Sequence, residues 1–218
     1  MHQIGVTFAV PKLSFHLAGL YIHIPFCRKA CTYCNFHFTT SLRYKNELVA
    51  ALLSELELRT RPALNDMPNA YAGYRKIDTV YFGGGTPSML EPAALQQLLN
   101  TVYKHYQVQP GAEITLEANP DDCTDEQLDA WQSTGINRLS IGIQSLFDDT
   151  LEWMNRTHSA AQSKRVIERA RAAGFRQFSV DLIYGTPHLT DDQLLEELSW
   201  VQAQHVEHLS CYALTVEE

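Results

Sequence analysis

Three cysteines near the N-terminal end of the chain have the spacing that most strongly suggests chemistry. Cys27, Cys31 and Cys34 form a Cys-x3-Cys-x2-Cys pattern directly after a short apolar run. Thiolates are the usual protein ligands of iron–sulfur clusters, and three of them can bind three irons of a four-iron cluster. The fourth iron is then free to bind another molecule, and this open position is where we expect the chemistry to occur.

The same three cysteines could instead bind zinc, with a histidine as the fourth ligand. His23 and His37 are near enough in the sequence to serve. The zinc alternative does not account for the glycine loop and the hydrogen-bonding side chains that follow later strands. A purely structural role for the thiols fits poorly, because the cysteines lie on a predicted loop between polar residues.

The segment around the cysteines resembles the cluster-binding signature of the radical S-adenosylmethionine (SAM) superfamily. The run YIHIPFC at residues 21–27 is similar to one branch, which holds the oxygen-independent coproporphyrinogen III dehydrogenases and the HemW heme chaperones. Two later motifs, FGGGTPS at residues 82–88 and LEANP at residues 116–120, fit the same branch. The similarity runs from about Gly19 to the end of the chain.

This resemblance implies a [4Fe-4S] cluster on the three cysteines, with SAM bound exchangeably at the open iron. The implied SAM contacts include the glycine loop, near the methionine amino group, and a carboxylate near the ribose hydroxyls. Positions that match family residues facing the cluster, SAM or substrate are Tyr21, Tyr33, Gly84, Gly85, Thr86, Glu117, Gln144, Arg156 and Asp181. Heme is a third implied cofactor, but the nine histidines show no spacing that identifies an axial ligand.

Each of these residues also has a purely structural interpretation. Glycine is the usual residue where a turn needs positive φ, and Glu117 could be a solvated carboxylate or a helix cap. Gln144, Arg156 and Asp181 could be a turn amide, a surface cation and a buried strand acid. Tyrosines in strands commonly belong to the core. The functional interpretation of all these positions therefore depends on the resemblance.

One position distinguishes the two functions within the branch. The dehydrogenases resemble Cys-x3-Cys-x2-Cys-x-Cys, whereas this chain has Phe36 at the place of the last cysteine. The pattern Tyr33-Cys34-Asn35-Phe36 is similar to that of the heme chaperones. We therefore expect a heme-binding radical SAM protein that passes heme to acceptor proteins and accepts electrons from a donor such as a flavodoxin or ferredoxin. The alternative is a dehydrogenase that decarboxylates coproporphyrinogen III, so the sequence leaves open whether the protein is an enzyme.

Composition narrows the choice of partners and compartment. With 25 acidic and 17 basic residues and no basic block, the chain is not expected to bind nucleic acid. Five cysteines, three of them crowded together, do not fit a secreted disulfide framework, so a reducing cytoplasm is expected. The remaining two, Cys123 and Cys211, are expected to be unligated. No run approaches the roughly 18 apolar residues that a membrane helix needs.

Apolar periodicity and turn residues predict an α/β chain. Six runs are predicted as strands, at residues 19–24, 77–82, 112–117, 138–143, 177–184 and 208–214. Helices are predicted at residues 41–59 and 92–106 and after capping-box patterns that begin at residues 124, 159 and 190. Such alternation implies parallel strands joined by right-handed crossovers. The resemblance specifies a partial (βα)6 barrel of parallel strands with outer helices.

Parallel βα units gather their ligands at the carboxyl ends of the strands. The cysteine loop follows the first predicted strand, the glycine loop follows the second, Glu117 ends the third, Gln144 follows the fourth and Asp181 lies within the fifth. The sequence therefore predicts one composite site. Residues 1–18 are expected to be an N-terminal extension and residues 19–218 the radical SAM core. Because family members continue with a final helix and a C-terminal domain, we expect the chain to be truncated.

Overall fold

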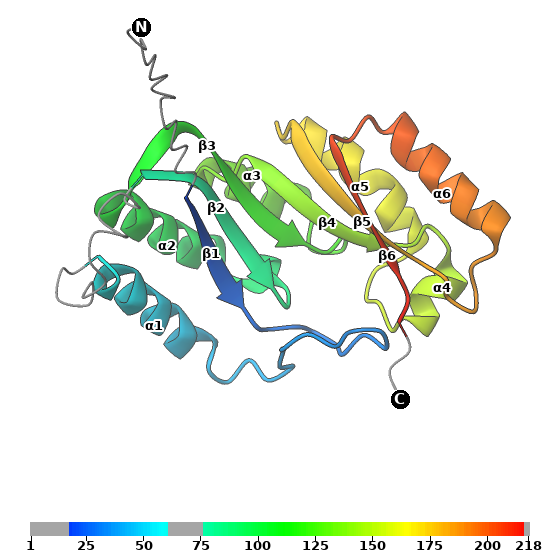
Figure 1. Cartoon of the computed structure of the whole chain (residues 1–218), viewed down its shortest axis with the longest axis horizontal. Helices are drawn as coiled ribbons and strands as arrows, with labels where there is room; N and C mark the ends of the chain where they lie inside the picture. The colour runs from blue at the N-terminus through cyan, green and yellow to red at the C-terminus, as the bar shows by residue number, and fades with distance from the viewer. Residues whose placement is uncertain (1–17, 61–75, 216–218) are drawn as a thin grey trace, which may run out of the picture.

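The computed structural model describes residues 18–60 and 76–215, in which strands and helices alternate along the chain (Figure 1). The strands are β1 (Gly19–Ile24), β2 (Lys76–Gly84), β3 (Gln107–Ala118), β4 (Arg138–Gln144), β5 (Gln177–Tyr184) and β6 (His208–Ala213). The helices are α1 (Lys45–Leu58), α2 (Pro92–His105), α3 (Asp125–Thr134), α4 (Asp148–Trp153), α5 (Ala160–Ala172) and α6 (Asp191–Ala203), with a 3-10 turn η2 (Pro87–Met89). Nearly all of the predicted N-terminal extension lies outside the described residues.

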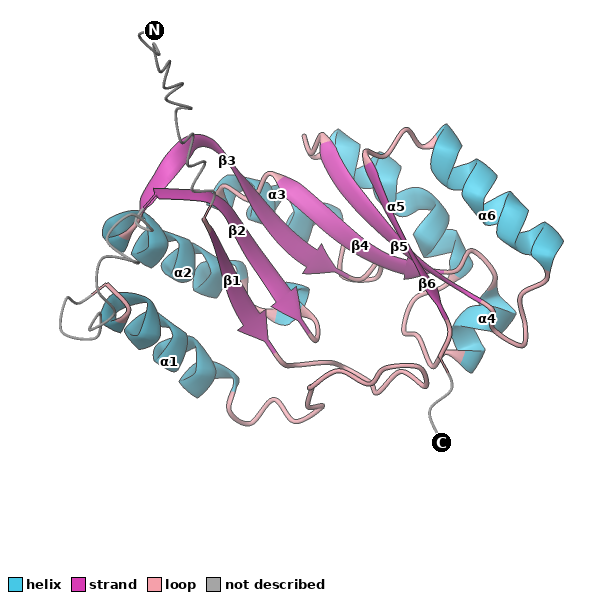
Figure 2. Ribbon diagram, viewed as in Figure 1, coloured by secondary structure: helices cyan, strands magenta, loops and turns pink. Residues whose placement is uncertain are grey.

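All six strands are parallel and lie in a single sheet in chain order, from β1 at one edge to β6 at the other. Figure 2 shows the helices on the outer face of the curved sheet. This arrangement confirms the predicted partial (βα)6 barrel. Every carboxyl end of a strand consequently points to the same rim, as the composite site requires.

Alternation along the strands separates an apolar outer layer from a more polar inner face. On β1, Ile22 and Ile24 are buried in the hydrophobic core, whereas Tyr21, directly before Ile22, is 60% exposed. On β3, buried Leu116 similarly precedes Glu117, which faces the inner side with the site. The hydrophobic core therefore lies between sheet and helices, and the inner face is left for polar chemistry.

The predicted helix starts are largely confirmed. Ser159 and Thr190 form complete capping boxes with the glutamines three residues later. At Thr124 only half of the motif forms, because the hydroxyl accepts from the Gln127 amide but the Gln127 Oε1 has no partner among the described residues. The sequence pattern identified the helix start but did not determine whether the second bond would form.

Three features of the fold differ from the sequence-based expectation. α1 begins at Lys45, four residues after the predicted start. β3 begins at Gln107, five residues before the predicted start, because its first residues pair with Lys76 and Ile77 of β2 before a shift in register. The short helix α4 was not predicted, since six residues hold too few turns to show a periodicity. Within residues 18–60 and 76–215, no helix has the length and apolar character needed to cross a bilayer.

Candidate cofactor site

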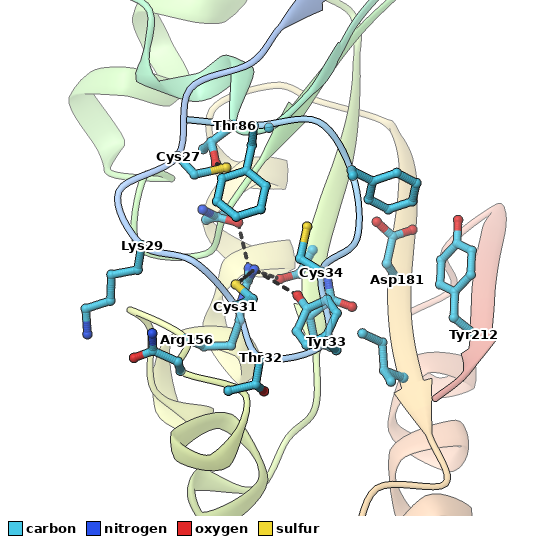
Figure 3. A pocket seen from close by; sticks show the side chains of 18 of the residues that line it. Cys27, Lys29, Cys31, Thr32, Tyr33, Cys34, Thr86, Arg156, Asp181 and Tyr212 are labelled. Carbon is cyan, nitrogen blue, oxygen red and sulfur yellow. Dashed lines mark hydrogen bonds between the residues drawn. The ribbon is translucent and has the colours of Figure 1, made fainter. Parts of the chain in front are cut away.

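A cavity of about 580 Å3 lies at the carboxyl ends of the strands. This volume is within the range of small-molecule sites. Its walls come from the cysteine loop after β1, the glycine loop after β2, the ends of β3, β4 and β5 and the segments after α4 and β6. The predicted site residues that line it are Cys27, Cys31, Tyr33, Cys34, Gly84, Gly85, Thr86, Glu117, Gln144, Arg156 and Asp181. The structure thus brings residues from five strands to one place (Figure 3).

Tyr21 is the predicted site residue that the structure does not bring into the cavity wall. Its ring stacks on Tyr81 with centroids 5.9 Å apart. Its hydroxyl lies 3.2 Å from His23 Nδ1. Tyr21 therefore belongs to an aromatic group on the inner face of β1 and β2, beside the glycine loop rather than at the cavity.

The cysteine loop is closed at its base by two backbone bonds. The Cys27 amide donates to the Thr39 carbonyl at 3.0 Å, and the Thr39 amide donates to the Pro25 carbonyl at 2.7 Å. The hydroxyl of Thr86 reaches Cys27 Sγ at 3.6 Å, and burial is the main cause that raises the pKa of this thiol. All three cysteines are free, partly exposed and part of the cavity wall, so their thiols are available as ligands.

The other two cysteines lie elsewhere. Cys123 is fully buried in the core, where its thiol donates to the Asn119 carbonyl at 3.4 Å. Cys211 is exposed on β6, and neither residue lines the cavity. Neither thiol is therefore placed beside Cys27, Cys31 and Cys34, and the expectation that both are unligated stays a prediction.

Among the described residues, no three His, Cys, Asp or Glu side chains are grouped as a single metal ion would need. A zinc ion requires its ligands around one centre. In a four-iron cluster, by contrast, each cysteine binds a different iron, so the thiols remain spread apart. Metal analysis of the purified protein separates the two alternatives.

The glycine loop packs directly against the cysteine loop. A Cβ on Gly85 would lie 2.7 Å from the Phe26 carbonyl oxygen and 2.9 Å from Cys27 Sγ. Gly84 has φ +123°, and a Cβ there would lie 2.8 Å from the His23 ring. The close approach that the glycines permit is thus, in this structure, an approach to the chain itself. A contact of these residues with SAM remains a proposal.

Glu117 connects β3 to the glycine loop through both carboxylate oxygens. Tyr81 Oη donates to Oε1 at 2.7 Å, and the Gly84 amide donates to Oε2 at 3.0 Å. Burial raises the pKa of Glu117, the two hydrogen bonds oppose that rise, and neighbouring Asp181 adds to it. The sequence analysis did not identify Tyr81. Its position two residues before Gly83 places it on the same face of β2 as the glycine loop, and this alternation could have indicated that Tyr81 faces the site.

The end of β4 presents Gln144 to the cavity in a left-handed backbone conformation, with φ 65°. His158 Nε2 lies 3.0 Å from the preceding Ile143 carbonyl. Directly after Gln144, the Ser145 hydroxyl and the Leu146 amide both donate to Glu197 Oε1, at 2.5 Å and 2.8 Å. Neither His158 nor Glu197 was predicted, because nothing local distinguishes them from ordinary residues of a loop and a helix.

Gln144 Oε1 is buried and has no hydrogen-bond partner in the part of the chain that the structure describes. The same holds for Arg156 Nε, and both side chains line the cavity. Buried polar atoms are nearly always paired with protein or with ordered water, so these two atoms are candidates for hydrogen bonds to water or to a bound ligand. The donor set suits SAM, which carries amino, carboxylate and hydroxyl groups.

Asp181 reaches the cavity from β5, beside Tyr212 of β6 (Figure 3). Burial raises the pKa of Asp181, whereas its hydrogen bond with Ser210 and the nearby His208 favour the ionised form. Asp181 and Glu117 therefore place two partly buried carboxyl groups on neighbouring sides of the cavity.

A parallel α/β partial barrel, with three free cysteines and unpaired polar groups at the mouth of its cavity, defines a class of cofactor-binding proteins with a thiol-ligated site. The model of the Radical SAM superfamily matches residues 21–201. The chain therefore belongs to the radical SAM superfamily.

Two curated relatives and one solved structure show the nearer similarities. The heme chaperone HemW of Escherichia coli K12 is 37% identical over 201 residues, which cover 91% of this chain and 51% of that protein. The mitochondrial radical S-adenosyl methionine domain-containing protein 1 of Mus musculus is 36% identical over 207 residues, covering 95% and 45%. Coproporphyrinogen III oxidase (HemN) from E. coli superimposes with a TM-score of 0.78 at 28% identity, covering 91% and 44%. The chain thus spans about half the length of the curated relatives it matches.

Proposed function

We propose that the protein is a heme chaperone of the radical SAM type, which binds heme for transfer to acceptor proteins. The observation that carries the proposal is the position of the Phe36 side chain. Its side chain is 77% exposed and lines the cavity at the place where the dehydrogenase pattern has a cysteine. A single exposed aromatic ring is common on protein surfaces, but this ring lines the cavity, where it could stack against a flat apolar ring system such as a porphyrin. The similarity to HemW over 91% of the chain supports the same function.

In this proposal Cys27, Cys31 and Cys34 hold a [4Fe-4S] cluster, and SAM occupies the cavity beside it. When bound, the cluster and SAM supply one-electron chemistry that the side chains cannot provide. Gln144 and Arg156, whose side chains line the cavity, would contact SAM. Tyr33, Gly84, Gly85, Thr86, Glu117 and Asp181 are the other residues proposed to contact SAM or to lie near the cluster. Tyr21, which lies beside the glycine loop and outside the cavity wall, is not among these contacts.

Hydrogen bonds within the chain support the proposed role of Glu117 as a SAM contact. The Glu117 carboxylate is held by Tyr81 and by the Gly84 amide, so it is oriented before any ligand arrives. Pre-organised groups bind at a lower entropic cost than mobile ones. Exchange of electrons with a flavodoxin or ferredoxin, transfer of heme to acceptor proteins and a cytoplasmic location complete the proposal.

Oxygen-independent coproporphyrinogen III dehydrogenase is the second candidate function. It is favoured by the TM-score of 0.78 to HemN, a protein described as a radical SAM enzyme. Incubation of reconstituted protein with coproporphyrinogen III and SAM, under anaerobic reduction, distinguishes the two. Formation of protoporphyrinogen would refute the chaperone as the primary function.

Metal analysis and heme titration test the proposal itself. Anaerobically purified protein is expected to contain iron and to give a cluster signal by electron paramagnetic resonance that changes when SAM is added. Zinc at one equivalent without iron would overturn the cluster assignment. Titration with heme should change the Soret band, and Phe36→Ala should weaken heme binding while leaving the iron content unchanged. No Soret change with the wild-type protein would count against a heme carrier.

A further inference from the structure

Arg156 makes four hydrogen bonds that join three parts of the site. Its Nη1 donates to Cys31 Sγ at 3.6 Å and to the Tyr33 hydroxyl at 3.2 Å. Its Nη2 donates to Asn119 Oδ1 at 2.6 Å and to the Gly142 carbonyl at 2.9 Å. The guanidinium therefore links the cysteine loop to the ends of β3 and β4, as Figure 3 shows for Cys31 and Tyr33.

The direction of the bond to Cys31 is set by the other contacts. A guanidinium is planar, so the two acceptors of Nη2 also fix the orientation of Nη1. The cation is thus held with its N–H groups directed toward the cysteine loop.

The cysteine loop is also attached to the α4 segment without Arg156. The Thr32 amide donates to the Met154 carbonyl at 3.2 Å, and its hydroxyl donates to the Trp153 carbonyl at 3.0 Å. Asn155 Nδ2 donates to the Ala30 carbonyl at 2.8 Å. Because these three bonds do not involve the Arg156 side chain, we expect them to hold the loop when Arg156 is replaced, so that the electrostatic effect of Arg156 can be measured separately.

Two other cations line the cavity, and they are placed differently. Arg28 forms ion pairs with Asp121 at 3.1 Å and with Asp122 at 2.6 Å. Lys29 points away from the cysteines in Figure 3. Arg156 is therefore the cation whose charge acts on the Cys31 sulfur through a direct hydrogen bond.

We propose that Arg156 raises the reduction potential of the cluster that Cys31 helps to hold. This inference rests on the proposed cluster and goes beyond a contact with SAM. Reduction adds one electron to a site that already carries three thiolates, and hydrogen bonds to the sulfurs are among the factors that set such potentials. A donor cation at Cys31 stabilises the more negative reduced form, because charge-assisted bonds strengthen as the acceptor gains charge.

Redox titration in the absence of SAM tests the inference. Wild type, Arg156→Gln and Arg156→Lys are reconstituted anaerobically and analysed for iron. Each protein then undergoes a redox titration, in which electron paramagnetic resonance measures the amount of reduced cluster at each potential. The midpoint potential should shift to more negative values in Arg156→Gln and by less in Arg156→Lys, which keeps the charge but loses the planar fork. Lys29→Gln is the matched control, since it removes a charge near the same loop without a contact to a sulfur, and its midpoint should stay at the wild-type value.

A fully loaded Arg156→Gln protein with the wild-type midpoint would overturn the inference. An equal shift in Lys29→Gln would also overturn it, because the effect would then be one of net charge rather than of the bond to Cys31. If Arg156→Gln takes up no iron, Arg156→Lys decides, and an unchanged midpoint there refutes the inference. A wild-type protein without a cluster would instead refute the proposed function, and the inference with it.

Discussion

Acid should destabilise this protein through His158. The side chain is 4% exposed, and its Nε2 lies 3.0 Å from the Ile143 carbonyl, to which a neutral imidazole can donate. Nδ1 has no partner among the described residues. Burial, together with the nearby charge of Arg156, lowers the pKa of His158 from 6.5 to about 4. The folded protein therefore keeps this histidine neutral under conditions in which the unfolded chain charges it.

The sign and size of the effect follow from proton linkage. Between pH 6.5 and about pH 4 the unfolded state binds a proton that the folded state does not, so the free energy of unfolding falls as the pH falls. One pH unit corresponds to about 1.4 kcal/mol, so the whole difference is worth about 3 kcal/mol, of which about 2 kcal/mol is lost by pH 5. Four buried or partly buried acids act in the opposite direction, because burial raises the pKa of Glu117, Asp122, Asp181 and Glu197.

The histidine is isolated by comparing wild type with His158→Gln, whose amide can still donate to the Ile143 carbonyl but does not titrate. Urea unfolding is measured for both proteins from pH 7.5 to pH 5. The difference in unfolding free energy should change by about 2 kcal/mol in favour of the variant as the pH falls. Parallel pH profiles, or a nuclear magnetic resonance titration that places the pKa of His158 near 6.5, would refute the reasoning.

Three further predictions test the construction of the site. Gly85→Ala places a methyl group 2.7 Å from the Phe26 carbonyl oxygen, so the glycine loop or the cysteine loop must move. Iron uptake should fall and the unfolding free energy should drop by about 1–3 kcal/mol, and wild-type iron uptake with wild-type stability would contradict this prediction. Glu197→Ala leaves the buried Ser145 hydroxyl and Leu146 amide without their acceptor, which should lower the unfolding free energy measured in urea by about 2–4 kcal/mol. Glu197→Gln keeps an acceptor oxygen and should retain most of the wild-type unfolding free energy, so equal losses in the two variants would count against the role of these bonds. Cys31→Ala should abolish the cluster signal in electron paramagnetic resonance and Cys123→Ala should leave it intact, since only the first lines the cavity; a cluster retained in Cys31→Ala would reveal another ligand.

Much of the fold could be predicted because its signals are local. β1 and β5 have the predicted bounds, since a strand shows as a short apolar run between turn residues. The hydroxyls of Ser159 and Thr190 marked two helix starts because a capping box lies within four consecutive residues. Local patterns did not predict α4 or the early start of β3, which depends on pairing with β2.

The convergence of the site was also predictable, for a topological reason. Alternating strands and helices form parallel βα units, and such units bring every strand's carboxyl end to one rim. The cysteines, Glu117, Gln144 and Asp181 could therefore be assigned to one cavity without knowledge of any contact.

The sequence by itself thus determined the order of the elements, the rim at which they meet and the kinds of groups that gather there. Tertiary structure alone decided that Tyr21 stacks beside the cavity, that Arg156 reaches Cys31, and that Glu197 supports the end of β4 from 51 and 52 positions away. The physical reason is the range of the interactions. Periodicity and capping act over a few residues, whereas a side-chain contact between distant segments depends on how the helices pack on the sheet.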